Sequence, residues 1–168
     1  MRNKGKVLVI NICKDPLHYY EFVRPIEDIL RKEGISYRTR KYDEIRDSDM
    51  KSADKMIICG TSLADNDFLE NTEMFQWIKR FSKPVLGICG GSHIIGLMLN
   101  KKIQKKEEIG MKRIRITKGF LGTKGEIEVY HLHKFQVLPE IFHKKNLYAV
   151  LFHPEVRNKG MVVEFARM

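Results

Sequence analysis

The stretch 83–99, KPVLGICGGSHIIGLML, constrains the fold of this chain more than any other. A strand-like apolar run ends in Cys89, the glycines Gly90 and Gly91 follow at once, and apolar residues then recur at helical spacing. A reactive side chain on a tight turn from a strand into a helix is called a nucleophile elbow. The turn lifts the side chain clear of the sheet, and the positive potential of the helix N-terminus favours a thiolate there. The sequence therefore predicts a reactive cysteine at the end of a buried strand.

Strand-like and helix-like patterns alternate along most of the chain. Apolar or alternating runs predict strands over 6–11, 35–42, 55–60, 84–88 and 147–152. Helical spacing predicts helices over 71–81 and over 15–34, where Pro25 either lies at a helix start near Val23 or kinks the helix. This order is typical of an α/β fold, here a flavodoxin-like, doubly wound and mostly parallel sheet. Active residues in such sheets lie at the carboxyl ends of the strands.

The remaining segments carry weaker patterns. Residues 101–130 contain glycines and short alternating runs, which predict a small antiparallel extension, while 43–52 and 156–168 are expected to be an exposed connection and a short tail. The apolar face of the 71–81 helix is expected in the core: Met74, Phe75, Trp77, Ile78 and Phe81. Because no internal repeat or linker interrupts the chain, residues 1–168 are expected to form a single domain.

Charge and cysteine content exclude several classes of function. The 31 basic and 21 acidic residues give a net charge of +10, but the basic residues are spread along the chain without a nucleic-acid-binding motif. A nucleic-acid partner is therefore not expected, although the charge suits an acidic protein surface. No run approaches the roughly 18–20 apolar residues of a membrane span, so no membrane partner is expected either. The odd number of cysteines, 3, favours reduced thiols and a cytoplasmic location.

A second motif follows the last predicted strand, where the chain reads LFHPE. A cysteine nucleophile needs a base, and the base needs an orienting group. His153 and Glu155 are two residues apart, so in strand-like geometry their side chains point to the same side. Glu155 can then accept a hydrogen bond from one imidazole nitrogen while the other nitrogen faces Cys89.

Together, GICGG and LFHPE resemble the class I glutamine amidotransferase family, whose usual motifs are G-I-C-x-G-x-Q and Q-F-H-P-E. The resemblance covers nearly the whole chain, including Glu108-Ile109-Gly110 and YHLHKFQVLPE. It implies that Cys89 attacks the side-chain amide of glutamine to form a γ-glutamyl thioester, with His153 as general base and acid and Glu155 as its orienter. It also implies that backbone N–H groups of Gly90 and of the Gly60-Thr61 turn hold the oxyanion, and that no cofactor is needed.

The chain departs from the family motifs at positions that concern the substrate. His93 stands where the family usually has glutamine, Gly60-Thr61-Ser62 replaces consecutive glycines and a proline, and Leu151 replaces the glutamine before FHPE. The substrate is therefore glutamine or another γ-glutamyl compound. His93 and His133 are expected to lie near it as substrate-binding residues.

Three functions remain open at this level. One is a glutaminase subunit that passes ammonia to a separate synthetase, since the chain has no phosphate-binding loop of its own. The second is a γ-glutamyl peptide hydrolase with the same triad, and the third is a non-catalytic binding or regulatory subunit.

The histidines of the 130–143 segment are expected to line the cleft rather than to bind a metal, and the other two cysteines are expected to have no part in the chemistry. His131 and His133 share one strand face and can form a metal pair with His143, but the sequence shows no carboxylate or cysteine that completes the set, so no metal is expected. Cys59 is expected to pack in the core, and Cys13 to be structural or incidental.

Overall fold

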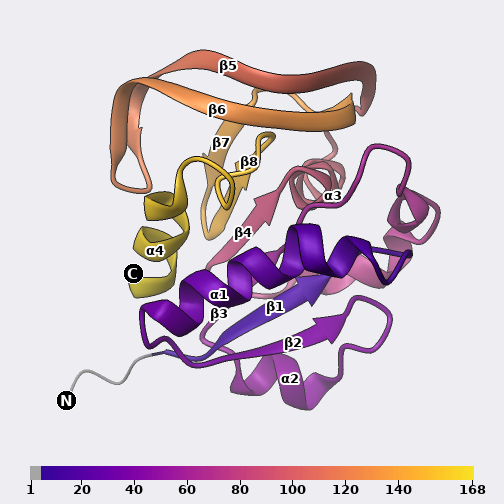
Figure 1. Cartoon of the computed structure of the whole chain (residues 1–168). Coiled ribbons are helices and arrows are strands. Elements are labelled where there is room, and N and C mark those ends of the chain that lie inside the picture. The colour runs from indigo at the N-terminus through magenta and orange to yellow at the C-terminus, as the bar shows by residue number, and fades with distance from the viewer. Residues whose placement is uncertain (1–4) are drawn as a thin grey trace.

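The computed structural model describes residues 5–168 and has a mixed α/β architecture (Figure 1). In this part of the chain, six strands form the central sheet in the order β2-β1-β3-β4-β8-β7. Strand β7 pairs antiparallel with β8, and all other pairs are parallel. The bounds are β1 (Val7–Asn11), β2 (Tyr37–Lys41), β3 (Lys55–Ile58), β4 (Val85–Ile88), β7 (Ile141–Lys144) and β8 (Leu147–Val150). The predicted fold class, a doubly wound and mostly parallel sheet, is confirmed.

Helices cover both faces of the sheet because its central strands are apolar on both sides. Val7 and Val9 of β1 face a core that is closed by α1 (Arg24–Lys32) and α4 (Lys159–Arg167). Leu8 and Ile10 face the opposite core, closed by α2 (Asp47–Ser52), α3 (Gly90–Met98) and the 3₁₀ helix η3 (Thr72–Lys79). Two short turns, η1 (Tyr19–Val23) and η2 (Asp67–Glu70), follow β1 and β3. Among the described residues, no helix is long and apolar enough to cross a membrane.

Two expected helices differ in type from the prediction. The segment 15–34 divides into η1, a π-helical turn, and α1, which begins at Arg24 with Pro25 in its first turn. The segment 71–81 is the 3₁₀ helix η3 rather than an α-helix. Because residues i and i+3 align in a 3₁₀ helix, Phe75 and Ile78 face the sheet together. Met74 lies outside that row and is 44% exposed, so its expected place in the core is wrong.

Two segments that we expected to lack regular structure are helical. Residues 47–52 form α2, whose buried Asp49 accepts hydrogen bonds from Arg38, from Arg40 and from the backbone N–H of Arg46. This helix is held by a buried carboxylate rather than by an apolar stripe, so periodicity could not reveal it. The expected tail contains α4, whose buried face is short: Met161, Val162, Phe165 and Ala166.

The antiparallel extension consists of two long strands instead of several short ones. Strands β5 (Gln104–Phe120) and β6 (Thr123–Gln136) form a two-stranded ribbon that is separate from the main sheet (Figure 1). Glycines that suggested breaks, Gly110 and Gly119, lie within β5. The backbone N–H of His153, just after β8, donates to the carbonyl oxygen of Tyr130 in β6 at 2.9 Å. The ribbon thus lies against the carboxyl ends of the central strands.

The elbow region depends on glycines that allow the backbone to approach closely. A Cβ atom on Gly91 would lie 2.4 Å from the carbonyl oxygen of Ile58, whereas a Cβ atom on Gly119 would meet nothing within 4 Å. We therefore expect Gly91→Ala to lower the free energy of unfolding by about 1–3 kcal/mol, the typical cost of overpacking. Urea denaturation measures this, and Gly119→Ala is the matched control, with an expected change within about 0.5 kcal/mol. Equal effects of the two changes would contradict the role of this contact.

Candidate active site

Cys89 lies on a strained turn between β4 and α3. Its backbone has φ 49° and ψ −104°, in the region of positive φ that non-glycine residues rarely adopt. Its N–H donates to the carbonyl oxygen of Val150 at 2.8 Å, which ties the turn to β8. The side chain follows a buried strand and precedes the first turn of a helix, which is the geometry of a nucleophile elbow.

His153 and Glu155 form a buried pair directly after β8. Nδ1 of His153 lies 2.7 Å from Oε1 of Glu155, and the two residues are 0% and 2% exposed. Burial by itself lowers the pKa of His153, but the negative charge of Glu155 and the contacts of the ring with Glu155 and Cys89 outweigh it and hold that pKa well above its ordinary value. The imidazole is therefore a group that holds a proton close to the cysteine sulfur.

Gly60, after β3, brings a third strand end to the same place. A Cβ atom here would lie 2.6 Å from Cε1 of His153 and 3.2 Å from the Cβ of Cys89. Only glycine fits this contact without displacing the imidazole. Within residues 5–168, the N–H groups of Thr61 and Gly90 make no hydrogen bond to a backbone carbonyl. The fold of these residues therefore does not use either N–H as a donor to the backbone, and a role for them in stabilising an oxyanion stays a prediction.

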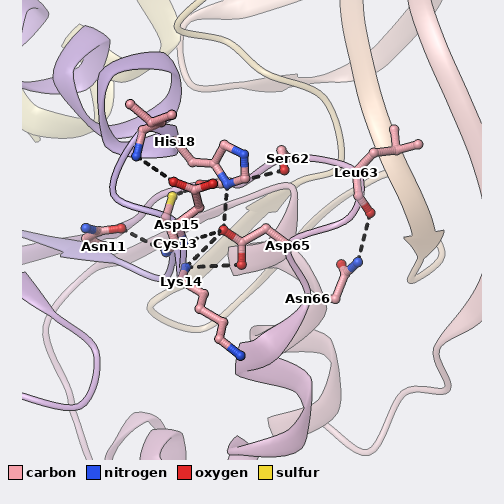
Figure 2. A network of polar contacts seen from close by, with 11 residues as sticks. Asn11, Cys13, Lys14, Asp15, His18, Ser62, Leu63, Asp65 and Asn66 are labelled. Carbon is pink, nitrogen blue, oxygen red and sulfur yellow. Dashed lines mark hydrogen bonds and ion pairs between the residues drawn. The ribbon is translucent and has the colours of Figure 1, made fainter.

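The loop that follows Gly60 is tethered by Asp65, a residue that sequence reasoning missed (Figure 2). Its carboxylate accepts from the backbone N–H groups of Lys14 (2.9 Å) and Asp15 (3.2 Å) and lies 2.7 Å from Nδ1 of His18. Burial would raise the pKa of Asp65, yet these hydrogen bonds hold it below its ordinary value. The tether fixes the loop after β3 to the loop after β1. No sequence motif predicts this tether, because the partners of Asp65 are mainly backbone groups.

The carbonyl oxygen of Leu132, in β6, covers the cysteine and the histidine. It lies 3.5 Å from Sγ of Cys89 and 3.2 Å from Nε2 of His153, and both groups donate to it. Cys89 is only 3% exposed as a result. The sequence carries no signal for this contact, since any residue supplies a backbone carbonyl.

His93 and His133, the two expected substrate-binding residues, are both buried beside this site. The ring nitrogens of His93 make no well-formed hydrogen bond among residues 5–168, although the backbone of Phe135 lies near the ring. Burial, with His133 nearby, lowers the pKa of His93 to about 4, so its ring is neutral at pH 7. Burial and the neighbouring His131 also lower the pKa of His133.

A carboxylate does accompany the histidine pair of β6, which corrects the sequence interpretation. Glu108, His131 and His133 each offer a ligand atom, and these atoms lie within 4.8 Å of one another. Glu108 comes from β5, directly opposite His133 in the ribbon. His143 is not part of the group, because its ring stacks on Tyr148 at 3.9 Å in the β7–β8 pair.

Comparison with known proteins agrees with this geometry. The family model for glutamine amidotransferase class-I matches residues 17–141, well over half of the chain. The chain belongs to the class I glutamine amidotransferase family. The matched region includes Cys89 and ends before His153 and Glu155, so the latter two rest on the FHPE motif and on the structure.

Curated relatives are subunits of a synthase. The imidazole glycerol phosphate synthase subunit HisH of Vibrio cholerae is 25% identical over 153 residues, which cover 65% of this chain and 75% of that relative. The subunit of the same name from Bacteroides fragilis is 26% identical over 172 residues, covering 79% of this chain and 86% of the relative.

Solved structures share the fold. A glutamine amidotransferase from Thermotoga maritima superposes with a TM-score of 0.66 at 17% identity, covering 92% of this chain and 77% of the other. A Thermoplasma acidophilum protein described as a candidate GMP synthase component has a TM-score of 0.82 at 20% identity, with coverage of 99% and 94%. At these identities the likeness shows the fold alone.

The raised pKa of His153 links the folded state to pH. The folded value lies above the unfolded value of about 6.5, so the imidazolium contributes stability that is fully present below that pH and is lost as pH rises through the folded pKa. We expect Glu155→Gln to lower the pKa of His153, measured by NMR titration of the ring protons. The free energy of unfolding of the unchanged protein should exceed that of Glu155→Gln at low pH. This difference should become smaller as the pH rises above about 6.5. The exposed change Glu164→Gln is the control, and an unaltered titration in Glu155→Gln would rule out the pair.

Proposed function

We propose that this protein is a glutaminase subunit that hydrolyses the side-chain amide of glutamine and passes the ammonia to a separate synthetase. The observation that carries the proposal is the buried contact of Cys89, His153 and Gly60 at the ends of three strands. Such a contact unites a nucleophile, a base and backbone donors within a few ångströms, as acyl transfer requires.

The chemistry follows from the positions of these groups. The Cys89 thiolate attacks the amide carbon, its proton having passed to Nε2 of His153, and the carbonyl oxygen becomes an oxyanion facing the N–H groups of Thr61, Gly90 and the Gly60 turn. When the tetrahedral intermediate collapses, the C–N bond breaks and His153 gives its proton to the nitrogen, which leaves as ammonia. Water then attacks the γ-glutamyl thioester with His153 as base, releasing glutamate and restoring Cys89. Glu155 keeps Nδ1 protonated, so that Nε2 is the atom that exchanges the proton.

The position of β6 supports a partner-dependent reaction. Because the Leu132 carbonyl occupies hydrogen bonds of both Cys89 and His153, substrate can reach the sulfur only when the ribbon moves. The curated relatives are named as synthase subunits, which favours a separate synthetase that docks over this edge and displaces β6. The net charge of +10 suits an acidic docking surface. The three cysteines are free and buried, in keeping with a reducing, cytoplasmic setting.

The buried histidines bear on which compound is the substrate. Neutral His93 offers a donor and an acceptor that make no well-formed hydrogen bond among the described residues, which suits the polar end of glutamine or of another γ-glutamyl compound. A γ-glutamyl peptide hydrolase is therefore retained as a variant of the same chemistry. Hydrolysis of γ-glutamyl peptides without hydrolysis of glutamine would select it.

A non-catalytic subunit is the second candidate, and one observation favours it. Cys89 is 3% exposed beneath the Leu132 carbonyl. A non-catalytic subunit that kept the triad only by descent would have the same structure as a catalytic subunit without its partner. Reactivity of the sulfur separates the two functions.

Glutamate release from glutamine tests the main proposal. We expect Cys89→Ala and His153→Ala to lower the rate by roughly 10³-fold or more, because only the backbone donors and substrate binding then remain. His143→Ala, a histidine outside the site, is the matched control and should retain the rate. The assay is run with and without proteins that co-purify from the native host. Full turnover by Cys89→Ala would refute the mechanism.

Alkylation by iodoacetamide, read by peptide mass spectrometry, tests the cysteine itself. Burial raises the pKa of Cys13 to about 11 and that of Cys59 well above its ordinary value, so both thiols should stay unreactive. We expect Cys89 to be labelled at least about tenfold faster than either of them, because only the thiolate reacts. Equal rates at the three cysteines would favour the non-catalytic subunit.

The tether of the loop after Gly60 is tested by Asp65→Asn. This change removes the charge that holds two backbone N–H groups and His18, so we expect kcat to fall about 10- to 100-fold, matching the roughly 1.5–3 kcal/mol of hydrogen bonds to a charged group. Alkylation of Cys89 should be unchanged, since the elbow does not depend on Asp65. Glu70→Gln, on the same pocket wall, is the control. Equal losses of kcat in the two variants would show that the tether does not position the loop.

A further inference from the structure

The hydrogen bonds of His133 leave two acceptor atoms facing each other. Nδ1 of His133 lies 2.9 Å from the carbonyl oxygen of Lys106, which can only accept, so Nδ1 carries the proton. Nε2 then presents its lone pair to Oε2 of Glu108 at 3.0 Å. A ring nitrogen and a carboxylate oxygen at this distance need a cation between them, either a second proton or a metal ion.

His131 shows a similar arrangement. Its Nε2 contacts a carboxylate oxygen of Glu140, an acceptor that fixes the ring proton on Nε2. Nδ1 is then a free lone pair, and it is buried without a hydrogen-bond partner among residues 5–168. A histidine with one nitrogen held by a carboxylate or carbonyl and the other left bare is the usual arrangement of metal-binding histidines.

We propose that Glu108, His131 and His133 bind a divalent transition-metal ion of the zinc class. Two imidazole nitrogens and one carboxylate oxygen are ligands that Zn²⁺ prefers, with a fourth position left for water. One ligand atom from each of the three residues lies within 4.8 Å of the others, and tetrahedral ligands at about 2.0–2.2 Å from zinc are roughly 3.3–3.6 Å apart. Small shifts of the three side chains are therefore enough to bring the ligand atoms to the spacing that zinc requires. The Glu108 side chain is 22% exposed and gives an ion access, while both histidine side chains are at most 2% exposed.

The site is built across the ribbon, next to the catalytic candidates. Glu108 belongs to β5 and both histidines to β6, so a bound ion cross-links the two strands. Leu132 lies between the two histidines, and its carbonyl accepts hydrogen bonds from Cys89 and His153. The ion would hold this carbonyl in place and slow any reaction at Cys89. This consequence rests on the proposed function, whereas metal binding itself does not.

Binding is tested on the full chain with Zn²⁺ by equilibrium dialysis and with Co²⁺ by its visible absorption. We expect one ion per chain in the unchanged protein. Glu108→Gln and His133→Gln should weaken binding by at least about 100-fold, and Glu140→Ala by about 10- to 100-fold as the loss of an outer partner. His143→Gln is the matched control and should bind as the unchanged protein does. Circular dichroism of each variant without metal checks that it folds. If His133→Gln does not fold, Glu108→Gln keeps the test valid, because the Glu108 side chain is partly exposed.

Cys89→Ala distinguishes this site from a thiolate site. We expect it to bind Zn²⁺ with unchanged affinity, and Co²⁺ in the unchanged protein to show no sulfur-to-metal charge-transfer band. Binding that is lost in Cys89→Ala, or equal in His133→Gln and His143→Gln, would overturn the proposal, as would no binding by the unchanged protein. Alkylation of Cys89 should slow at least about tenfold with Zn²⁺ in the unchanged protein but not in Glu108→Gln. If glutamine is not hydrolysed under any condition, the proposed function fails while the dialysis result stands.

Discussion

The direct contact between the backbones of β3, β4 and α3 is the constraint on which the site depends. A Cβ atom on Gly87 or Gly91 would lie 2.4 Å from a backbone atom of the neighbouring element, so these segments touch without intervening side chains. The turn at Cys89 therefore cannot relax, and it retains a positive φ that costs about 1–3 kcal/mol. The packed sheet stabilises that strain. Cys89, the imidazole of His153 and the backbone N–H groups beside them are thus positioned by main-chain packing, which varies little with side-chain rotation.

The parts of the structure that could be predicted are those in which residue type and spacing carry the physical cause. Buried parallel strands need apolar residues on both faces, so the runs at β1, β3, β4 and β8 are visible in the sequence. Gly90 and Gly91 after Cys89 are also visible in the sequence, and they let the first turn of α3 pack directly on its neighbours. Since the carboxyl ends of parallel strands meet at one edge, the predicted strands also predict that Cys89, His153 and Gly60 come together, and the structure brings them within contact.

The features that escaped prediction depend on contacts whose partners are not marked by residue type. Asp65 tethers its loop through backbone N–H groups, and Leu132 acts through its carbonyl, which every residue has. Helix α2 is held by buried Asp49 and two arginines, a cause that apolar periodicity does not detect. Glu108 joins the histidines of β6 only through the register of the ribbon, and register over a hairpin with bulges is not fixed by composition.

The ribbon couples the two polar centres of this protein. In a strand, side chains alternate while the carbonyls lie in the plane of the sheet, so His131 and His133 can point inward while the carbonyl of the residue between them meets Cys89. That carbonyl accepts from the sulfur and from the imidazole that any substrate amide would have to engage. The proposed reaction at Cys89 therefore requires that β6 be displaced. Whatever fixes the ribbon, an ion between its strands or a protein docked on its outer face, acts on the cysteine through this one backbone oxygen.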